Sequence, residues 1–370
     1  MPERPPIANE HILKPYGLEA PEGAQVNYHI GYIKNAQGEI EYTRPLPSVR
    51  VPEQSVELYP QAVAATIRPS KRKPIARDYK LLYVFSDAQI DYRRLPDGTL
   101  LPIHDERALE VGALLCRDLQ PDYIINLGDT VDHAAISRFD PKSDHFFRTL
   151  GISYQRVHDY YAQLRADNPR ARVIEVDSNH NIRLPKHVLK HMPSMYGVKR
   201  AGSDAEEYPV MTYPYLANLR AVGVEWIGGY GAAEFLYGEE YGTPPIAFRH
   251  GTENSPNGTT AAKIMKNYPE THNVHGHDHT MQMATRTTRL GHYLVSVVVG
   301  ASCRTTGEVE GFHSSIDDRG NVVKRQENWQ NGILLIEDYG GRYIFRQIPI
   351  YGGTAFYNGK EYTVNEEHHA

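Results

Sequence analysis

Short apolar runs, each followed closely by polar side chains, recur along this chain and predict the strands of a sheet. Five runs of strand length show this pattern, at residues 81–85, 123–127, 172–176, 246–248 and 273–274. The segments 106–119 and 152–167 lie between the early runs and are long enough for helices. Strands that alternate with helices indicate an α/β fold, in which ligand-binding side chains sit in the loops after the strands.

Three further stretches have strand patterns and complete the middle of the chain. They are residues 293–299, 332–337 and 343–350. Together with the earlier runs they predict one large domain over residues 79–350. Within it, the segment 194–241 is rich in Tyr and Gly, and we expect it to be an insertion close to the site.

The two ends of the chain carry no comparable pattern. Residues 1–78 form a Pro-rich extension with a predicted hairpin, 26–33 with 39–43, and end in a basic linker. The linker cations fit a solvated connection or a contact with a phosphate backbone. We expect the extension to be a contact for a partner or a second copy, and residues 351–370 to be an extended or frayed tail.

Composition narrows the class of protein without indicating a reaction. The 370 residues are 40% hydrophobic and 23% charged, as in ordinary globular proteins. Its apolar runs are too short to span a bilayer, and the start of the chain lacks the apolar core of a secretory signal. Two cysteines make no disulfide framework, so we expect a cytoplasmic protein. The net charge of −5 gives no general nucleic-acid signature.

The polar residues after the five apolar runs are of the types that bind divalent metals. They form the series Asp87-x-Gln89, Gly128-Asp129-x-x-Asp132, Asn179-His180-Asn181, His250 and Gly276-His277-x-His279. Carboxylate and amide oxygens suit Mg and Mn, and neutral imidazoles suit Zn and Fe. This ordered series resembles the calcineurin-like metallophosphoesterase superfamily, whose pattern is D-x-H, G-D-x-x-[DN], G-N-H-[DE], a lone His and G-H-x-H.

The resemblance implies a fold and a two-metal site. The fold would be two facing mixed β-sheets flanked by helices, in the four-layer order α/β/β/α. Two sets of four ligands are implied, which share Asp129: Asp87, Gln89, Asp129 and His279 for one metal, and Asp129, Asn179, His250 and His277 for the other. A hydroxide between the metals would attack phosphorus, with His180 at the phosphate and Asp132 and Asn181 as further catalytic candidates. Manganese is the expected metal, with Mg, Fe or Zn as alternatives.

Two motifs depart from the family pattern, the first at Gln89 and the third at Ser178, where the family has Gly, and at Asn181. Gln89 stands where the family has His, and an amide oxygen is a harder ligand than imidazole, which favours Mn or Mg over Zn. Asn181 stands where the family has an acid that orients the imidazole of His180, although its amide oxygen can still accept a hydrogen bond. We expect catalysis to survive both changes.

Each candidate also has a purely structural interpretation. Asp87 and Asp132 are of a type that caps helices and turns, and His250 taken alone is more often structural than a ligand. Asp105 is expected to be the N-cap of the helix at 106–119. Three histidines fall outside the family pattern and are expected in supporting or surface positions, with the first best placed for substrate contact: His133, His272 and His275.

The substrate is the least determined part of the prediction. The opening Ser86-Asp87-x-Gln89 and the segment 328–332 resemble phage-encoded members that are grouped with SbcD-like repair nucleases. This implies a Mn-dependent DNA exonuclease or endonuclease in the host cytoplasm. A phosphodiesterase or phosphatase for small or cyclic nucleotides is the alternative, and a metal-bound scaffold with weak catalysis is the second. Five tyrosines fit either base stacking at the rim of the site or a small subcore: Tyr208, Tyr213, Tyr215, Tyr230 and Tyr237.

Overall fold

The computed structural model describes residues 63–94, 97–137, 148–255, 257–305 and 328–364, and the backbone of six short strands outside these ranges. The chain divides into two units, Met1–Pro60 and Gln61–Ala370. All of the metal-ligand candidates lie in the second unit, and each unit is therefore considered by itself.

The first unit contains two antiparallel strand pairs. β1 (Gln25–His29) pairs with β4 (Leu46–Arg50), and β2 (Tyr32–Lys34) pairs with β3 (Ile40–Tyr42). The expected strand at 26–33 is thus divided between β1 and β2, which have different partners. The rest of the residues between 26 and 43, and all side chains of this unit, lie outside the described residues.

The larger sheet of the second unit has eight strands and places the predicted runs side by side. In spatial order the strands are β10 (Val224–Ile227), β9 (Arg172–Val176), β8 (Tyr123–Asn126), β5 (Lys80–Phe85), β18 (Asn331–Asp338), β19 (Tyr343–Tyr351), β20 (Thr354–Tyr357) and β21 (Lys360–Thr363). The first four are parallel, and β18 joins β5 in antiparallel register and begins the antiparallel half. β5 is buried from its second residue onward, which explains its unbroken apolar sequence.

The second sheet has five strands. In spatial order they are β11 (Phe235–Tyr237), β12 (Ile246–Arg249), β13 (His272–His275), β15 (Tyr293–Val299) and β14 (Met281–Thr287). The three inner strands are parallel, and both edge strands are antiparallel to their neighbours. The carboxyl ends of β12 and β13 therefore meet at one edge, as those of β5, β8 and β9 do in the larger sheet.

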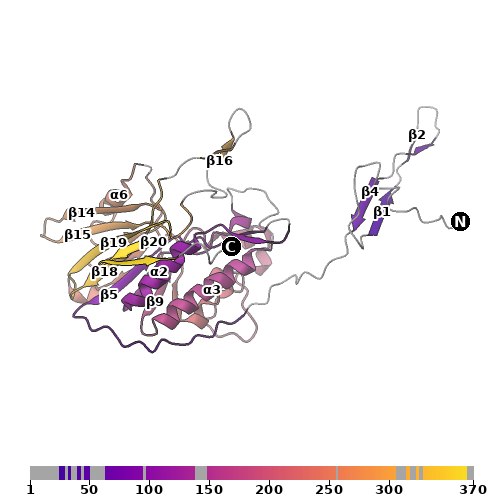
Figure 1. Cartoon of the computed structure of the whole chain (residues 1–370). Coiled ribbons are helices and arrows are strands. Elements are labelled where there is room, and N and C mark those ends of the chain that lie inside the picture. Colours follow the sequence, from indigo (N-terminus) through magenta and orange to yellow (C-terminus); the bar gives the residue numbers. More distant parts are fainter. Residues whose placement is uncertain are drawn as a thin grey trace. The chain divides into compact units, whose positions relative to one another are not determined.

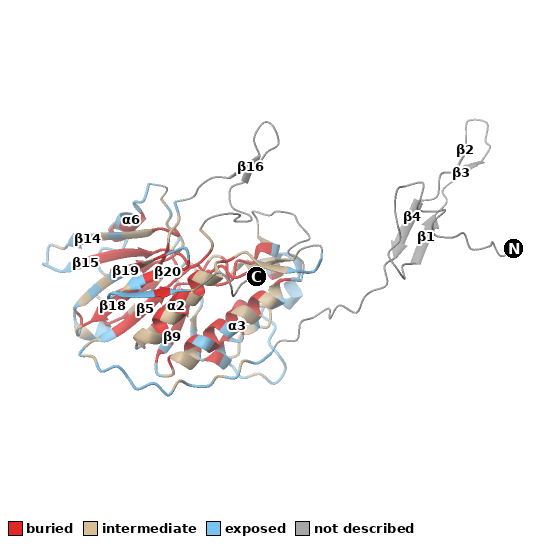
Figure 2. Cartoon of the chain, viewed as in Figure 1, coloured by how far each residue is buried: buried red, intermediate tan, exposed pale blue. Residues whose placement is uncertain are grey.

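The two sheets face each other, and helices cover their outer faces (Figure 1). Leu82 and Val84 of β5 belong to the apolar core between the sheets, together with Phe248 and Val297 from the second sheet. Alternate residues of β5 point the other way, into the core beneath α2 (Glu106–Leu119) and α3 (Leu150–Asp167). α6 (Thr260–Asn267) packs on β14 and β15 of the smaller sheet. Figure 2 shows the buried residues concentrated in the two sheets. The predicted α/β class and its four layers are confirmed.

Shorter elements connect the layers. They are β6 (Tyr92–Arg94), β7 (Leu100–Pro102), η2 (Ala134–Ile136), α4 (Arg183–His191), η4 (Pro193–Met195), α5 (Tyr213–Leu216), η5 (Leu219–Val222), η6 (Glu239–Tyr241), β16 (Ser314–Ile316) and β17 (Val322–Lys324). Within the described ranges, no helix combines the length and apolarity needed to cross a bilayer.

Two parts of the chain differ from the expected organisation. Residues 351–370 were expected to be a tail, but β20 and β21 form a hairpin that extends the larger sheet through β19. Ala355 and Tyr362 are buried on that hairpin, and this burial holds the segment in place. The segment 194–241, expected as an insertion, supplies an edge strand to each sheet, β10 and β11. Residues 365–370 lie outside the described residues.

Local signals set the bounds of α2. The Asp105 carboxylate accepts a hydrogen bond from the Ala108 N–H at 3.0 Å, as expected of an N-cap. The helix ends at Gln120, whose φ of 46° is left-handed. Cys116 lies on its inner face and is fully buried. α3 begins two residues earlier than predicted, at Leu150 rather than residue 152.

The basic linker lies along α2 and α3 over the described residues 63–79. Gln155 of α3 exchanges two hydrogen bonds with the backbone of Val63, and the Ser70 N–H donates to the Ala166 carbonyl at 2.7 Å. Arg72 pairs with Asp118 of α2 at 3.2 Å. This stretch is therefore attached to the domain surface rather than being a free connection.

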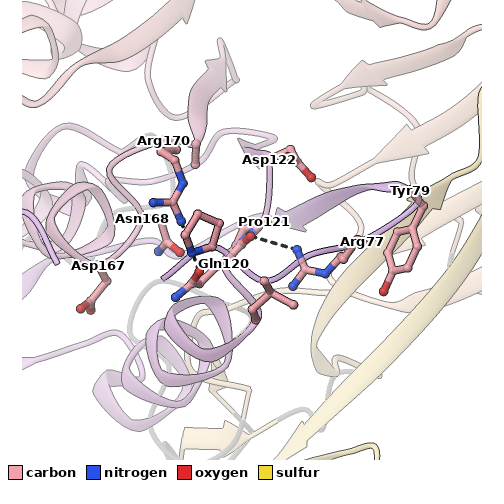
Figure 3. A pocket seen from close by; sticks show the side chains of 11 residues that line it. Arg77, Tyr79, Gln120, Pro121, Asp122, Asp167, Asn168 and Arg170 are labelled. Atoms are coloured by element: carbon pink, nitrogen blue, oxygen red, sulfur yellow. Dashed lines mark hydrogen bonds between the residues drawn. The ribbon is translucent and has the colours of Figure 1, made fainter. Parts of the chain in front are cut away.

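A small hollow of about 130 Å³ lies where the linker reaches the sheet (Figure 3). Arg77 crosses it and donates to the carbonyls of Leu119 and Gln120, the second at 3.1 Å. Asn168 and Arg170 line its other side. The hollow adjoins the amino ends of the parallel strands, and none of the metal-ligand candidates lines it.

Candidate metal centre

The seven predicted ligands come from five loops that follow parallel strands. Asp87 and Gln89 follow β5, Asp129 follows β8, Asn179 follows β9, His250 follows β12, and His277 and His279 follow β13. Since the carboxyl ends of parallel strands share an edge, strands from both sheets bring these loops together.

One part of the cluster is centred on His250. Its Nε2 lies 3.3 Å from Oδ2 of Asp129 and 2.7 Å from Oδ1 of Asn179. Its Nδ1 donates to the Leu127 carbonyl at 2.9 Å, which leaves Nε2 facing the cluster. The ring of His277 is 5.1 Å from that of His250. Ligand atoms of Asp129, His250 and His277 all lie within 4.8 Å of one another, so these three residues can hold a metal ion.

The other part of the cluster is centred on His279. Its Nε2 lies 3.1 Å from Oδ1 of Asp87 and 3.3 Å from the side-chain amide of Gln89. The backbone joins the two parts, because the Gln89 N–H donates to the Asp129 carbonyl and the His277 N–H donates to Oδ2 of Asp87. The structure thus places all seven predicted ligands in one connected cluster.

Five of the seven residues have a left-handed backbone. The φ angles are 53° for Asp87, 47° for Gln89, 51° for Asp129, 68° for His277 and 56° for His279. A side chain with a Cβ disfavours this region by roughly 1–2 kcal/mol. The left-handed conformation turns each side chain inward after its strand. The fold tolerates the resulting strain at the place where these polar side chains converge.

Two glycines leave no room for a side chain beside these loops. A Cβ on Gly128, whose φ is +98°, would meet the Val176 carbonyl oxygen at 2.6 Å and the Ser178 side chain at 2.5 Å. A Cβ on Gly276 would meet the side chains of Ser86 and Asp87. These close approaches let the loops after β8 and β13 pack against those after β9 and β5.

The charge states suit a divalent cation. Burial alone would raise the pKa of the Asp129 carboxyl, but His180, His250 and His277 outweigh it and hold that pKa well below its usual range. Burial, with His250 adding to it, lowers the pKa of His277 to about 4. Burial acts against a proton on His250, yet Asp129 raises the pKa of that imidazole. A cation would take over the charge compensation that such a proton supplies. Ionised carboxylates, an amide oxygen and imidazoles in one buried cluster therefore fit a divalent metal.

His180 lies beside the cluster and is held by three residues. Its backbone N–H donates to Oδ1 of Asp129 at 2.9 Å, and its ring Nδ1 lies 2.9 Å from Oδ1 of Asp132. Arg183 donates to its Nε2 at 2.6 Å and to the Asp132 carbonyl at 2.6 Å. Burial would raise the pKa of the Asp132 carboxyl, but His180 and Arg183 lower it. Asp132 is therefore the carboxylate nearer to the His180 ring, and Oδ2 of Asp129 lies 3.6 Å from its Nε2.

Asn181 has a different environment from the one expected of it. Its Nδ2 donates to Oε1 of Glu175 at 3.3 Å, pointing to the core, while the carboxylate of Asp132 is next to the ring of His180. Glu175 also accepts from Thr130, Tyr161 and Tyr213: the hydroxyl distances are 2.5, 2.7 and 2.9 Å. Burial raises the pKa of this fully buried carboxyl to about 7.

The three histidines outside the family pattern are all buried, at His133, His272 and His275. His133 does not face the solvent as a substrate contact would. Its Nδ1 lies 2.9 Å from the His180 carbonyl and its Nε2 lies 2.7 Å from the Tyr154 hydroxyl, so it supports the backbone of His180. Burial, reinforced by Arg183, lowers the pKa of His133 to about 3.

Three residues at the site escaped the sequence prediction. Arg183 follows His180 by one helical turn, and that cationic spacing was the available signal. Cys303 follows β15 and lies 3.8 Å from Nδ1 of His279. The ring of Trp329 lies 4.4 Å from that of His279. The end-of-strand rule applied to β15 would have selected Cys303.

The tyrosines of 194–241 divide between core and site. Tyr213 and Tyr237 are buried in the two apolar cores, as expected of a subcore. The ring of Tyr230 is 6.1 Å from that of His250, and its hydroxyl donates to the Gly251 carbonyl at 3.4 Å. Tyr230 is half-buried, so one tyrosine of the five lies beside the metal-ligand candidates.

Comparison with known proteins gives a limited result. No family model and no curated protein sequence matches the chain. Among solved structures, Vacuolar Protein Sorting 29 from Cryptosporidium parvum aligns with a TM-score of 0.34 and 11% identity, over 77% of this chain and 99% of that one. A single mutant of Vps29 from Entamoeba histolytica gives 0.33 and 12% over 77% and 99%. Wild-type Vps29 from the same organism, complexed with Zn²⁺, gives 0.34 and 11% over 75% and 96%. At these scores the likeness carries no conclusion about activity.

Proposed function

We propose that the protein is a divalent-metal-dependent phosphodiesterase of the calcineurin-like metallophosphoesterase type. The observation that carries this proposal is the connected cluster of Asp87, Gln89, Asp129, Asn179, His250, His277 and His279 on five end-of-strand loops. Strained backbone in five of these residues supports it independently, since such strain concentrates at functional sites.

The residues divide into two sets of donors around Asp129. His250, Asn179 and His277 would hold one metal and Asp87, Gln89 and His279 the other, with Asp129 between them. Manganese is our preferred metal, because Gln89 replaces an imidazole by an amide oxygen. Bound divalent metals supply positive charge to phosphoryl oxygens and lower the pKa of water.

His180 is the residue that we propose to move a proton. While Arg183 donates to Nε2, the lone pair of that nitrogen accepts this hydrogen bond, so Nε2 carries no proton and Nδ1 faces Asp132. A phosphate that draws the Arg183 guanidinium toward itself frees the Nε2 lone pair, which takes up a proton from solvent, and Asp132 stabilises the imidazolium that forms. His180 can then protonate the leaving oxygen of the diester.

The finer prediction is a Mn-dependent DNA nuclease of the SbcD-like group. Its alternatives are an enzyme for small or cyclic nucleotides and a metal-bound scaffold with weak catalysis. A substrate panel with linear DNA, cyclic nucleotides and a chromogenic bis-phosphodiester, each with Mn, Mg, Zn or no metal, separates them. DNA degradation supports the nuclease, and turnover of small diesters alone eliminates it.

The matched test of the site uses the two aspartates at opposite ends of β8. We expect Asp129→Asn to lower diester hydrolysis at least about a thousandfold, since about 4 kcal/mol of transition-state stabilisation depends on the shared ligand. Asp122 precedes β8 and accepts from the Leu81 N–H at 2.8 Å. Asp122→Asn should retain hydrolysis and metal content. Full activity of Asp129→Asn with saturating metal would overturn the proposal.

A further inference from the structure

The segment after His180 exposes an unusual amount of apolar surface. α4 buries only Leu184 and Val188, and every residue from 189 to 202 is exposed. The exposed apolar side chains of this stretch, with their exposed fractions, are Leu189 54%, Met192 41%, Met195 38%, Tyr196 55% and Val198 37%. Contiguous apolar surface on a soluble domain marks a site of interaction.

The same segment is strongly cationic. Between Arg183 and Arg200 the charged residues are Arg183, Lys186, Lys190, Lys199 and Arg200, with His187 and His191 beside them and no Asp or Glu. Arg183, Lys186 and Lys190 have the spacing i, i+3, i+7, so they form a stripe along one face of α4. The stripe is about 10 Å long at 1.5 Å per residue.

Acidic groups lie at both ends of this surface, and at its start Asp132 pairs with Arg183 at 3.2 Å. Arg200 lies 3.8 Å from Glu207, and Arg220 pairs with Asp204 at 2.8 Å. Lys199 donates to the Ala205 carbonyl. Lys186 and Lys190 are exposed and lie away from these acids in sequence, on the helix. The two lysines of the stripe are therefore open to an anionic partner, whereas Arg183 is paired with Asp132 at the site.

The stripe is continuous with the candidate centre. α4 begins at Arg183, whose guanidinium donates to both His180 and Asp132. An anion bound along α4 thus reaches the imidazole that we assign to the scissile phosphate. A small nucleotide would occupy only the Arg183 end and leave the rest of the stripe unused.

We propose that the α4–η4 surface, residues 183–198, binds the nucleic-acid strand that continues from the scissile phosphate. This inference rests on the proposed phosphodiesterase function. Arg183, Lys186 and Lys190 contact successive parts of the phosphate backbone, and Tyr196 with the exposed methionines beyond them contacts the bases. A nucleic-acid strand carries repeated phosphates that are joined to flat bases. These two kinds of group match the cations and the apolar side chains of this surface.

Binding of fluorescent oligothymidylate and oligouridylate to the full chain, in the presence of a chelator, tests the surface. We expect Lys186→Glu/Lys190→Glu to weaken binding at least tenfold. The slope of log K against log salt should fall in magnitude by about 1.4, since each lost phosphate contact removes roughly 0.7 for single strands. The paired oligomers distinguish DNA from RNA as the source of the strand.

Two variants make the result specific. Lys263→Glu/Lys266→Glu changes the charge equally on exposed positions of α6 and should leave binding within twofold. Tyr196→Ala should weaken binding about fivefold or more while leaving the salt slope unchanged, because it removes a base contact rather than a phosphate contact. Thermal unfolding of each variant checks that it is folded.

Several outcomes would overturn the inference. They are undetectable oligonucleotide binding by the parent chain, equal losses in the α4 and α6 variants, and equal affinity for polyglutamate or anionic vesicles. Weaker oligonucleotide binding in the α4 variant, when the parent chain hydrolyses no diester in the substrate panel, would reject the proposed function and retain the binding surface.

Discussion

The two ends of strands β5 and β8 close the same sheet in opposite ways. At the amino ends, Arg77 donates to the last carbonyls of α2 and Asp122 accepts from the Leu81 N–H, both in ordinary side-chain-to-backbone contacts. At the carboxyl ends, Asp87, Gln89 and Asp129 turn inward with left-handed φ angles. The amino edge is closed by hydrogen bonds from side chains to the backbone. The carboxyl edge instead brings the candidate metal ligands close together.

The difference shows where the fold carries strain. Each left-handed residue costs roughly 1–2 kcal/mol, so the carboxyl edge needs many fixed contacts to keep three of them. Gly128, Ser178 and the network around Glu175 supply such contacts. The amino edge needs fewer, and a hollow remains there. Substitutions at the carboxyl edge should therefore cost more than those at the amino edge.

The largest effect is expected for Gly128→Ala. The alanine would have a backbone φ of +98°, and its Cβ would clash with Val176 and Ser178. We therefore expect the free energy of unfolding to fall by about 3–5 kcal/mol. Gly229 has a φ of +99° with open space around a Cβ. Gly229→Ala should cost only about 1–2 kcal/mol. Urea denaturation measures both, and equal losses would show that close packing adds nothing to the backbone strain.

Glu175→Gln should change how stability depends on pH. Burial raises the pKa of Glu175 from its ordinary 4.5 to about 7, so the folded chain binds this proton more tightly than the unfolded chain does. The contribution of Glu175 to the free energy of unfolding is greatest below about pH 4.5. It falls as the pH rises and levels off above about pH 7. The total fall is on the order of 3 kcal/mol.

Glu175→Gln keeps the shape of the side chain and removes this titration. We therefore expect the variant to gain relative to the parent chain as the pH rises from 5 to 8, by up to roughly 3 kcal/mol. Thermal and urea unfolding across that range measure the difference between the two proteins, which cancels other titrating groups. Parallel stability curves would show that Glu175 is not the titrating carboxyl.

The smallest effect is expected for Arg77→Ala at the amino edge. The loss of charged donors to Leu119 and Gln120 at the end of α2 should lower the free energy of unfolding by about 1–2 kcal/mol. Metal affinity should remain within twofold, because the carboxyl edge is unaffected. Lys71→Ala, an exposed cation of the same linker, should change neither quantity. A large loss of metal binding in Arg77→Ala would mean that the two edges are coupled.

Local signals in the sequence predicted much of this arrangement. Asp105 gave the start of α2 because an N-cap acts within one turn, and the bounds 106–119 agree with the structure. The polar residues after β5, β8, β9, β12 and β13 could be selected because strand ends and residue types are both visible in sequence. The structure places them together, and their role as ligands remains for the aspartate test.

Features that depend on distant partners could not be predicted in this way. Asp132 rather than Asn181 lies beside the ring of His180, because side-chain direction is decided by the whole packing of β9 and α4. β20 and β21 were missed because they join the sheet by pairing with β19, and their own sequence does not indicate this pairing. Arg183 follows His180 by one helical turn, but its second partner, Asp132, is on another loop and could not be identified from the sequence.

The antiparallel pairing of β18 with β5 has a consequence for synthesis. β5 is buried next to β18 in the finished sheet, with Leu334 opposite Val84, yet β18 is made long after β5. At about 5–20 residues per second, this apolar edge stays unpaired for on the order of tens of seconds while the chain emerges. Nascent chains that stop before residue 331 should thus be the species most prone to associate through β5. The β5 edge of the parallel half is covered only when β18 has been made and pairs with it.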